Sequence, residues 1–577
     1  MSDRPVNDPA DERDLATLTG RAQLPAEVRA AGGLRQLDYI LNLPAPAELV
    51  GELAVEELYL LLQDIGTTDA YPLLEHASDE QLVGLVDLDA WHRDGFDIAR
   101  FVSWLDLSLA VDVDTGLRFL GAQDDETLEW LFMDGDIEIH ASDLDPSDVP
   151  DDREVFQSPD GMYWVTVPGE HPLVDRIPQL LKLLWAQDGD RARVLFQQAR
   201  VDLGTSVTDY MTQFRDGRLQ DIGFDSLEGA LAVFSRRDPK ALRAEVRAKL
   251  AEREPLRPAH VGVMARDLVL SGVAAPDLFA RALARLDAPA RARFGEAFTF
   301  LVNRVFQALT GDLSRTDDLP IAARHAASLL NVGLAFVADE DEETASLALE
   351  RVWPLELFQV GYTLALDLAV RARRVLARAG QARGLTLFGS PVDETLGAVA
   401  LGRPMLFEGL TDPGLVGVRP FATLDELARV EVVLADAEAV IDFVEARFGV
   451  TPEAILDSPA LAGLDADARR RVRLATLLRT GFANLLLTDQ LAFTPLDRSA
   501  LQGFARAAFE KTGELSPLLR GAQAKVLEAA PPAVARLVEG ALDALVMALG
   551  RVRPEDLDPR YAGELFLVAP DADDADA

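Results

Sequence analysis

The sequence contains no cysteine among its 577 residues. This absence excludes disulfide bonds, thiolate nucleophiles, cysteine-ligated zinc and iron–sulfur clusters. Histidine is also scarce, with six residues in the whole chain. None of them has the paired spacing of a helical zinc site. We therefore interpret all six as satisfied or surface side chains: His76, His92, His140, His171, His260 and His325.

Positive charge is the second shortage. Lys and Arg total 56 against 96 Asp and Glu, a formal net charge of −40. Such a surface repels phosphates and anionic membranes, so we expect no nucleic-acid partner. The lysine-poor, arginine- and alanine-rich composition indicates either a GC-rich bacterial genome or salt adaptation.

Long apolar runs are also missing. We find no stretch of about 18 uncharged apolar residues, the length that a membrane-spanning helix needs. The polar start of the sequence has no apolar signal segment. We therefore expect no membrane insertion and a cytoplasmic location.

Catalytic sequence motifs are absent as well. There is no Gly-x-Ser-x-Gly, no phosphate-binding loop and no dinucleotide fingerprint. We name no catalytic residue and expect no cofactor. Enzymatic activity is not expected, although the sequence leaves it open.

What the sequence does contain is helical periodicity. Leu58, Leu61, Leu62 and Ile65 recur on one helical face. The stretch Ser78-Asp79-Glu80-Gln81 predicts a capping box at the start of another helix.

This pattern returns about 46 residues further on, which is the period of a two- or three-helix solenoid repeat. The aligned positions pair Tyr71, Leu73, Leu74, Asp79, Glu80, Leu82, Leu85 and Val86 with Leu117, Phe119, Leu120, Asp125, Glu126, Leu128, Leu131 and Phe132. Each unit has an apolar face that it cannot bury alone, so a stack of helices is predicted.

The middle of the chain changes character. Two aromatic and β-branched runs flank Pro159-Asp160-Gly161 and predict a single β-hairpin at about 154–167. Further on, Asp216-Gly217 and Ile222-Gly223 are interpreted as turn-like breaks between helices.

The predicted fold is mainly α and multi-helical, with an N-terminal helical-repeat (solenoid-like) array, one small β-hairpin and a C-terminal helical domain. We expect these boundaries: 1–30 disordered N-terminus, 31–141 helical repeats, 142–178 acidic linker and hairpin, 179–250 helices packing on the repeats, 251–568 C-terminal helical domain, and 569–577 disordered acidic tail.

An acidic run offers one candidate cation site. A twelve-residue calcium loop starting at Asp143 would draw its ligands from Asp143, Asp145, Ser147, Asp151 and Glu154. Asp148 stands where the loop needs glycine, and Pro150 disturbs it further. We interpret the run as a solvated acidic linker, and cation binding remains an open alternative.

Four other features have both a structural and a functional interpretation. Trp91 fills a gap between helices or stacks on a ligand. Gly389-Ser390-Pro391 is a turn in which Ser390 caps a helix, or an anion site. The stripe Arg371, Arg374 and Arg378, and the run 469–473, pair with acidic helices of this chain or grip phosphate. We favour the first interpretation in each case.

Several motifs resemble an uncharacterised bacterial family known only as a domain of unknown function. They include "SDEQLVGLVDLDAW", "DGMYWVTV", "RDGRLQDIGFDSLEGAL", "FGSPVDETL" and "RPMLFEGL", and the likeness runs from about 35 to 560. It implies no activity, cofactor or site residue. The capped helices of 55–135 also resemble the cytosolic helical-repeat domain of bacterial magnesium transporters, which in that family responds to divalent cations. The transporter's membrane helices have no counterpart here, so transport is not implied.

Three functional hypotheses follow from these observations. The first is a non-catalytic scaffold or regulatory protein that binds an unidentified protein partner. The second is a divalent-cation-responsive regulatory module. The third is an enzyme with an unfamiliar site within 387–421, lined by Arg403, Glu408 and Arg419.

Overall fold

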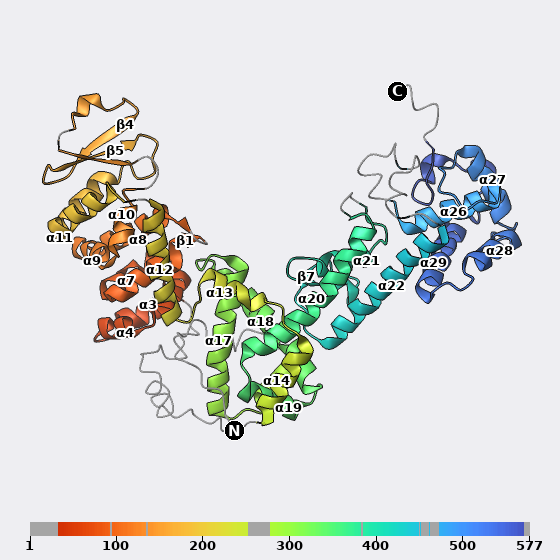
Figure 1. Cartoon of the computed structure of the whole chain (residues 1–577), viewed down its shortest axis with the longest axis horizontal. Coiled ribbons are helices and arrows are strands. Elements are labelled where there is room, and N and C mark those ends of the chain that lie inside the picture. The colour runs from red at the N-terminus through yellow and green to blue at the C-terminus, as the bar shows by residue number, and fades with distance from the viewer. Residues whose placement is uncertain are drawn as a thin grey trace. The chain divides into compact units, whose positions relative to one another are not determined.

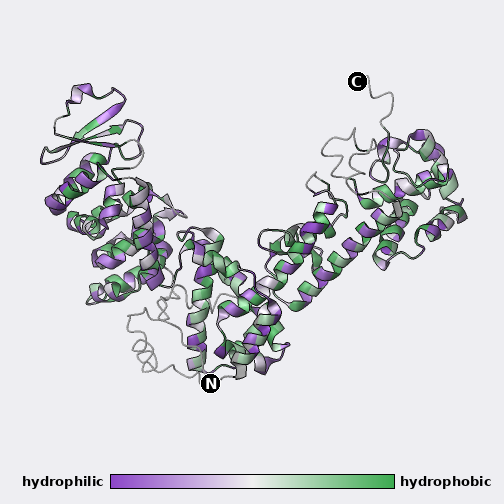
Figure 2. Cartoon of the chain, in the orientation of Figure 1, coloured by the Kyte–Doolittle hydropathy of each residue, from purple (hydrophilic) through white to green (hydrophobic). Residues whose placement is uncertain are grey.

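The computed structural model describes residues 33–92, 95–133, 137–142, 144–202, 204–251, 277–381, 385–448, 451, 461 and 472–569. Helices dominate these residues, which confirms the predicted mainly α fold (Figure 1). The chain divides into two compact units: Met1–Ser235, Lys249–Ala327 and Ser346–Glu356 form unit 1, and Arg236–Ala248, Ser328–Ala345 and Leu357–Ala577 form unit 2. Hydrophobic and hydrophilic residues are interspersed along the helices, as amphipathic packing requires (Figure 2).

Unit 1 begins with short helices and a small sheet. These elements are α3 (Gly33–Leu41), α4 (Pro46–Glu52), α5 (Val55–Ile65), α6 (Thr67–Ala70), η1 (Tyr71–His76), α7 (Asp79–Asp89), β1 (Trp91–His92), β2 (Gly95–Phe96), α8 (Ile98–Val111), α9 (Val113–Ala122), α10 (Asp125–Trp130), β3 (Glu138–Ala141), η2 (Pro146–Asp148), β4 (Arg153–Gln157) and β5 (Tyr163–Pro168). Further helices follow, of which α11, α12 and α17 are the longest: α11 (Ile177–Ala199), α12 (Gly204–Asp221), α13 (Leu227–Leu231), η3 (Ala232–Phe234), α16 (Asp277–Ala284), α17 (Ala288–Thr310) and η4 (Thr316–Asp318).

In the part that the structure describes, unit 2 is helical apart from one short strand pair and two isolated β-bridges. Its elements are α21 (Val392–Val399), β6 (Leu406–Phe407), η6 (Glu408–Leu410), β7 (Val418–Arg419), α22 (Leu424–Phe448), α26 (Leu474–Thr488), α27 (Arg498–Ala508), α28 (Pro517–Val526), α29 (Pro532–Leu549), η7 (Pro554–Asp556) and η8 (Pro559–Tyr561). Four helices have residues in both units: α14 (Pro239–Ala251), α18 (Leu319–Ala338), α19 (Glu342–Arg351) and α20 (Pro354–Arg378).

In the N-terminal part, alternate helices along the chain pack against one another. α3 packs on α5, α5 on α7, α7 on α9, and α9 on α11. The labelled helices α3, α7, α9 and α11 follow one another in this order in Figure 1. α7 is central, because all residues from Gln81 to Leu88 are buried. The predicted capping box at its start is confirmed: Ser78 Oγ accepts from the Gln81 N–H at 3.2 Å, and Gln81 Oε1 accepts from the Ser78 N–H at 2.7 Å.

The predicted hairpin is confirmed, and the sheet is larger than expected. β4 and β5 pair antiparallel, and β3 adds on the other side of β5, so the strand order is β3-β5-β4. Two further short pairs occur, β1 with β2 and β6 with β7. The prediction of a single hairpin was therefore wrong. A two-stranded hairpin is marginal alone, so a third strand and packing on a helix give it stability. Tyr163 of β5 packs on Phe196 of α11 with ring centroids 5.6 Å apart.

α12 corrects a second prediction. Asp216-Gly217 is not a break, because the helix runs through it to Asp221. The inward contacts of α12 outweigh the roughly 1 kcal/mol that a single interior glycine costs. The break at Ile222-Gly223 is confirmed: Gly223 has a φ of 88°, which favours glycine.

Among the described residues, one helical segment is long and apolar enough to span a membrane, Thr316–Ala338, and the sequence analysis did not single it out. Within the structure, 83% of its apolar window is buried. That burial is typical of a core helix.

Candidate interaction surface

A buried carboxylate organises the contact between α7 and α12. Asp87 lies in the last turn of α7 and is only 3% exposed. Arg218 of α12 donates from Nε to Oδ2 at 2.6 Å and from Nη2 to Oδ1 at 2.9 Å. Burial raises the pKa of the Asp87 carboxyl, and the hydrogen bonds and charge of Arg218 oppose that shift. A carboxylate near the C-terminal end of a helix also faces an unfavourable dipole, so this site depends on its arginine.

Arg218 also binds a second carboxylate, that of Asp124. Its Nη1 donates to Asp124 Oδ2 at 2.7 Å. Asp124 is the residue before α10, and its side chain makes no capping hydrogen bond to that helix. Arg218 thus connects α12 to both α7 and the start of α10.

A second arginine completes the inner face of α12. Val207, Met211, Arg215 and Leu219 recur at every fourth residue and are buried. Arg215 Nε donates to the Asp87 carbonyl at 3.0 Å, and its guanidinium lies 5.0 Å from the centre of the Trp91 ring. Trp91 is buried in a cluster with Val207 and Met211, which confirms its packing interpretation.

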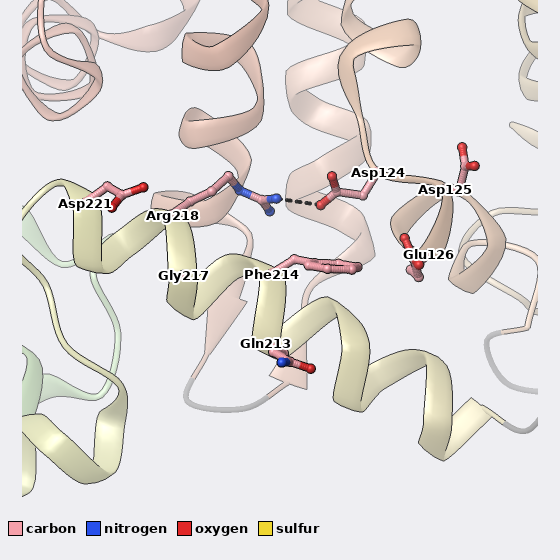
Figure 3. A pocket seen from close by; sticks show the side chains of 8 residues that line it. All are labelled: Asp124, Asp125, Glu126, Gln213, Phe214, Gly217, Arg218 and Asp221. Atoms are coloured by element: carbon pink, nitrogen blue, oxygen red, sulfur yellow. Dashed lines mark hydrogen bonds and ion pairs between the residues drawn. The ribbon is translucent and has the colours of Figure 1, made fainter.

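Two hollows lie against the outer side of α12. The first has a volume of about 620 Å³ and is lined by Asp124, Asp125, Glu126, Gln213, Phe214, Gly217, Arg218 and Asp221. The second has a volume of about 730 Å³ and is lined by Thr208, Asp209, Thr212, Gln213, Asp216, Gly217 and Gln220. Both are open to solvent, and they share Gln213 and Gly217. We call these residues together the α12 groove. Figure 3 shows Phe214 and Arg218 projecting from α12 toward the segment that carries Asp124 and Glu126.

The groove is acidic. Six carboxylates line it, against one arginine, and that arginine is held by Asp87 and Asp124. Asp125 is paired with Arg191 at 2.6 Å. Glu126, Asp209 and Asp221 make no ion pair or hydrogen bond through their side chains with any residue that the structure describes.

Glu129 lies on α10, one helical turn after the groove residue Glu126. It is 4% exposed, and burial followed by the charges of Asp202, Glu126 and Asp125 raises the pKa of its carboxyl to about 7. The surface carboxylates Glu126 and Asp125 therefore help to raise the pKa of the buried Glu129 carboxyl.

Three of the histidines that the structure describes lie close to polar groups. His92 lies 2.9 Å from Asp312 and 3.3 Å from Asp97. His140 lies 3.1 Å from Thr166 Oγ1, and His171 Nδ1 accepts from the Leu173 N–H. His76 lies in η1 and His325 is buried, while His260 falls outside the described residues.

The members of the candidate calcium loop occupy different elements. Asp145 caps η2 by accepting from the N–H and Oγ of Ser147, and these bonds lower the pKa of Asp145. Glu154 lies in β4, and Asp143 falls outside the described residues. In the part of the chain that the structure describes, no group of three His, Asp or Glu side chains is arranged to hold a metal ion.

The basic stripe of α20 pairs with acids of α22. Arg371 bonds Glu438 and Glu431, and Arg378 bonds Glu445 and Asp442. These contacts confirm the intramolecular interpretation for both, whereas Arg374 is exposed. Residues 469–471 of the second run fall outside the described residues, and Arg473 donates to the Thr386 carbonyl at 2.5 Å.

The segment 387–421 contains one further correction. Ser390 does not cap α21; instead the Asp393 carboxylate accepts from the Gly389 N–H at 2.7 Å. The N-terminal turn of α21 therefore already faces a carboxylate of its own. Of the residues named for the enzyme hypothesis, Arg419 bonds Glu426 at 2.6 Å and lies 3.9 Å from Glu408, while burial lowers the pKa of Arg403.

A family model matches residues 12–568 of the chain. The chain belongs to DUF6178, a family of unknown function. No curated protein and no solved structure gives a significant match. The resemblance to an uncharacterised family is thus confirmed, and the likeness to the magnesium-transporter repeats stays a prediction.

The sequence analysis missed the residues that build the groove. The stretch "RDGRLQD" contributes only to the family resemblance, and its Asp-Gly pair is typical of a turn. The sequence does contain a signal for an unbroken helix: Val207, Met211, Arg215 and Leu219 recur at every fourth residue. Recognising this pattern requires that an arginine can lie on the buried face of a helix.

Proposed function

We propose that this DUF6178 member is a bacterial, cytoplasmic scaffold or regulatory protein that acts by binding another protein and does not catalyse a reaction. The observation that carries this proposal is the α12 groove. Substrate pockets are concave and mostly apolar, with a few converging polar groups. The groove instead is open, lined by carboxylates and amides, and its one arginine is already paired.

The N-terminal helices support the proposal through their arrangement. We propose that 69–88 and 115–134 are two copies of one helical repeat. The paired leucines Leu82 and Leu128 are both buried, as are Leu85 and Leu131, and the aligned Asp79 and Asp125 each begin a helix and are exposed. Helical repeat arrays present extended surfaces to which partners bind.

A photo-crosslinking experiment in cells tests the proposal. A crosslinking amino acid is placed at Gln213, which lines both hollows, and as a control at Val194 of α11, which is 51% exposed. We expect one discrete higher-mass product from position 213 that is lost with Phe214→Ala, and none from position 194. No product at position 213, or the same products at both positions, would contradict the scaffold function.

A further inference from the structure

The charge of the α12 groove restricts what can bind there. A negatively charged segment would meet Glu126, Asp209 and Asp221, whose charges no described residue neutralises. Arg218 cannot attract it, because releasing Arg218 would leave Asp87 buried and unpaired. A second copy of this chain is also disfavoured, because each copy carries a net charge of −40. Complementarity therefore favours lysine and arginine in the occupant.

The groove also offers an apolar anchor point. Phe214 lines the first hollow and is 43% exposed. Large aromatic side chains on a surface bury much area at a low entropic cost when a partner covers them. The occupant should therefore contain a large apolar residue among its basic ones.

Gly217 provides a third observation. It lies within α12 and lines both hollows, and a Cβ at this position would have no side chain and no backbone from outside its own helical turns within 4 Å. The fold itself therefore does not require glycine here, although glycine destabilises a helix relative to alanine. A glycine in an open groove lets the backbone of a partner approach closely.

We infer that the α12 groove binds a basic peptide segment of a partner protein, which places a large apolar residue against Phe214 and its backbone over Gly217. This inference rests on the proposed scaffold function and specifies the chemistry of the partner. Glu126 and Asp221 then pair with lysine or arginine of the segment on either side of the apolar residue.

Peptide display on the full chain tests the inference. Random twelve-residue peptides are selected on the parent protein and counter-selected on a groove variant that combines Phe214→Ala, Glu126→Gln and Asp221→Asn. A matched control combines Val113→Ala, Glu75→Gln and Asp114→Asn, which remove the same charge and an exposed apolar side chain outside the groove.

We expect the selected peptides to be enriched in lysine or arginine together with a large apolar residue. Their Kd should rise about tenfold or more on the groove variant, as for the loss of an interface anchor, and stay unchanged on the control. Acidic or uncharged selected peptides, or equal affinity for both variants, would overturn the inference. Self-association of the chain that the groove variant abolishes would overturn it as well.

Gly217→Ala tests whether the backbone of the partner lies close to Gly217. We expect this variant to raise the melting temperature and yet to weaken peptide binding. Unchanged peptide binding would show that the backbone does not pass over Gly217. A partner crosslinked at Gln213 without any basic peptide preference would reject the inference and leave the scaffold function standing, whereas failure of both experiments would reject both.

Discussion

The two proposed repeat copies, 69–88 and 115–134, share their buried leucines and differ in what their polar residues do. In the first copy Ser78 and Gln81 form a capping box at the start of α7. In the second copy Asp124 stands in the place of Ser78, and its carboxylate bonds Arg218 instead of capping α10. The apolar positions are thus shared, whereas the polar residue before the helix caps α7 in the first copy and ties the start of α10 to α12 in the second. The acidic start of α10 then becomes one wall of the groove.

All six tryptophans of the chain belong to unit 1, so tryptophan fluorescence during urea unfolding reports on this unit. That choice of probe avoids assuming that the two units unfold together. We therefore measure unfolding of the variants below by tryptophan fluorescence.

The largest effect is expected at the shared leucines. Leu82→Asp and Leu128→Asp each bury an unpaired carboxylate, which costs several kcal/mol. Each variant should unfold the N-terminal array, and Val113→Asp at an exposed position should not. A loss of stability of less than about 1 kcal/mol at either leucine would reject the alignment of the two copies.

The next largest effect is expected at Arg218. Arg218→Met leaves Asp87 buried without its ion-pair partner, and we expect a loss of about 3–5 kcal/mol in the free energy of unfolding. Adding Asp87→Leu should recover most of this loss, because an apolar pair of similar size packs well there. No recovery in the double variant would mean that Arg218 stabilises α12 by contacts other than Asp87.

A pH-dependent effect of intermediate size is expected at Glu129. Its pKa is raised from 4.5 to about 7 in the folded state, so the folded state binds the proton more tightly than the unfolded state. Stability should therefore fall as pH rises from about 4.5 to about 7, by up to about 3 kcal/mol from this group. Glu129→Gln should unfold like the parent at pH 4.5 and be more stable at pH 8. An advantage that does not change with pH would contradict the assigned shift.

The smallest effect is expected at the cap of the first copy. Ser78→Ala removes one hydrogen bond to the Gln81 N–H and should cost about 1 kcal/mol. Asp124→Ala should cost more, because it removes a partner of Arg218 rather than a cap. Equal costs at the two positions would mean that the copies do not differ in the way described.

Local signals explain what could be predicted from the sequence. The capping box at Ser78 and the hairpin turn at Asp160-Gly161 each depend on residues a few positions apart, and both were predicted. The third strand, β3, was not, because Glu138–Ala141 is short and pairs with β5 more than 20 residues later in the chain. The groove was missed for the same reason: Asp87, Asp124 and Arg218 come together only through packing, and Gly217 next to Asp216 looks locally like a turn.

Crosslinking from equivalent positions in the two copies tests whether the α12 groove binds another protein. A photo-crosslinking amino acid is placed at Glu126 in the second copy and at its counterpart Glu80 in the first, each in the first turn of its helix. We expect a discrete protein–protein product in cells from position 126, reduced by Phe214→Ala, and none from position 80. A product from position 80 alone, or none from position 126, would contradict the claim that the α12 groove is the protein-binding surface of this chain.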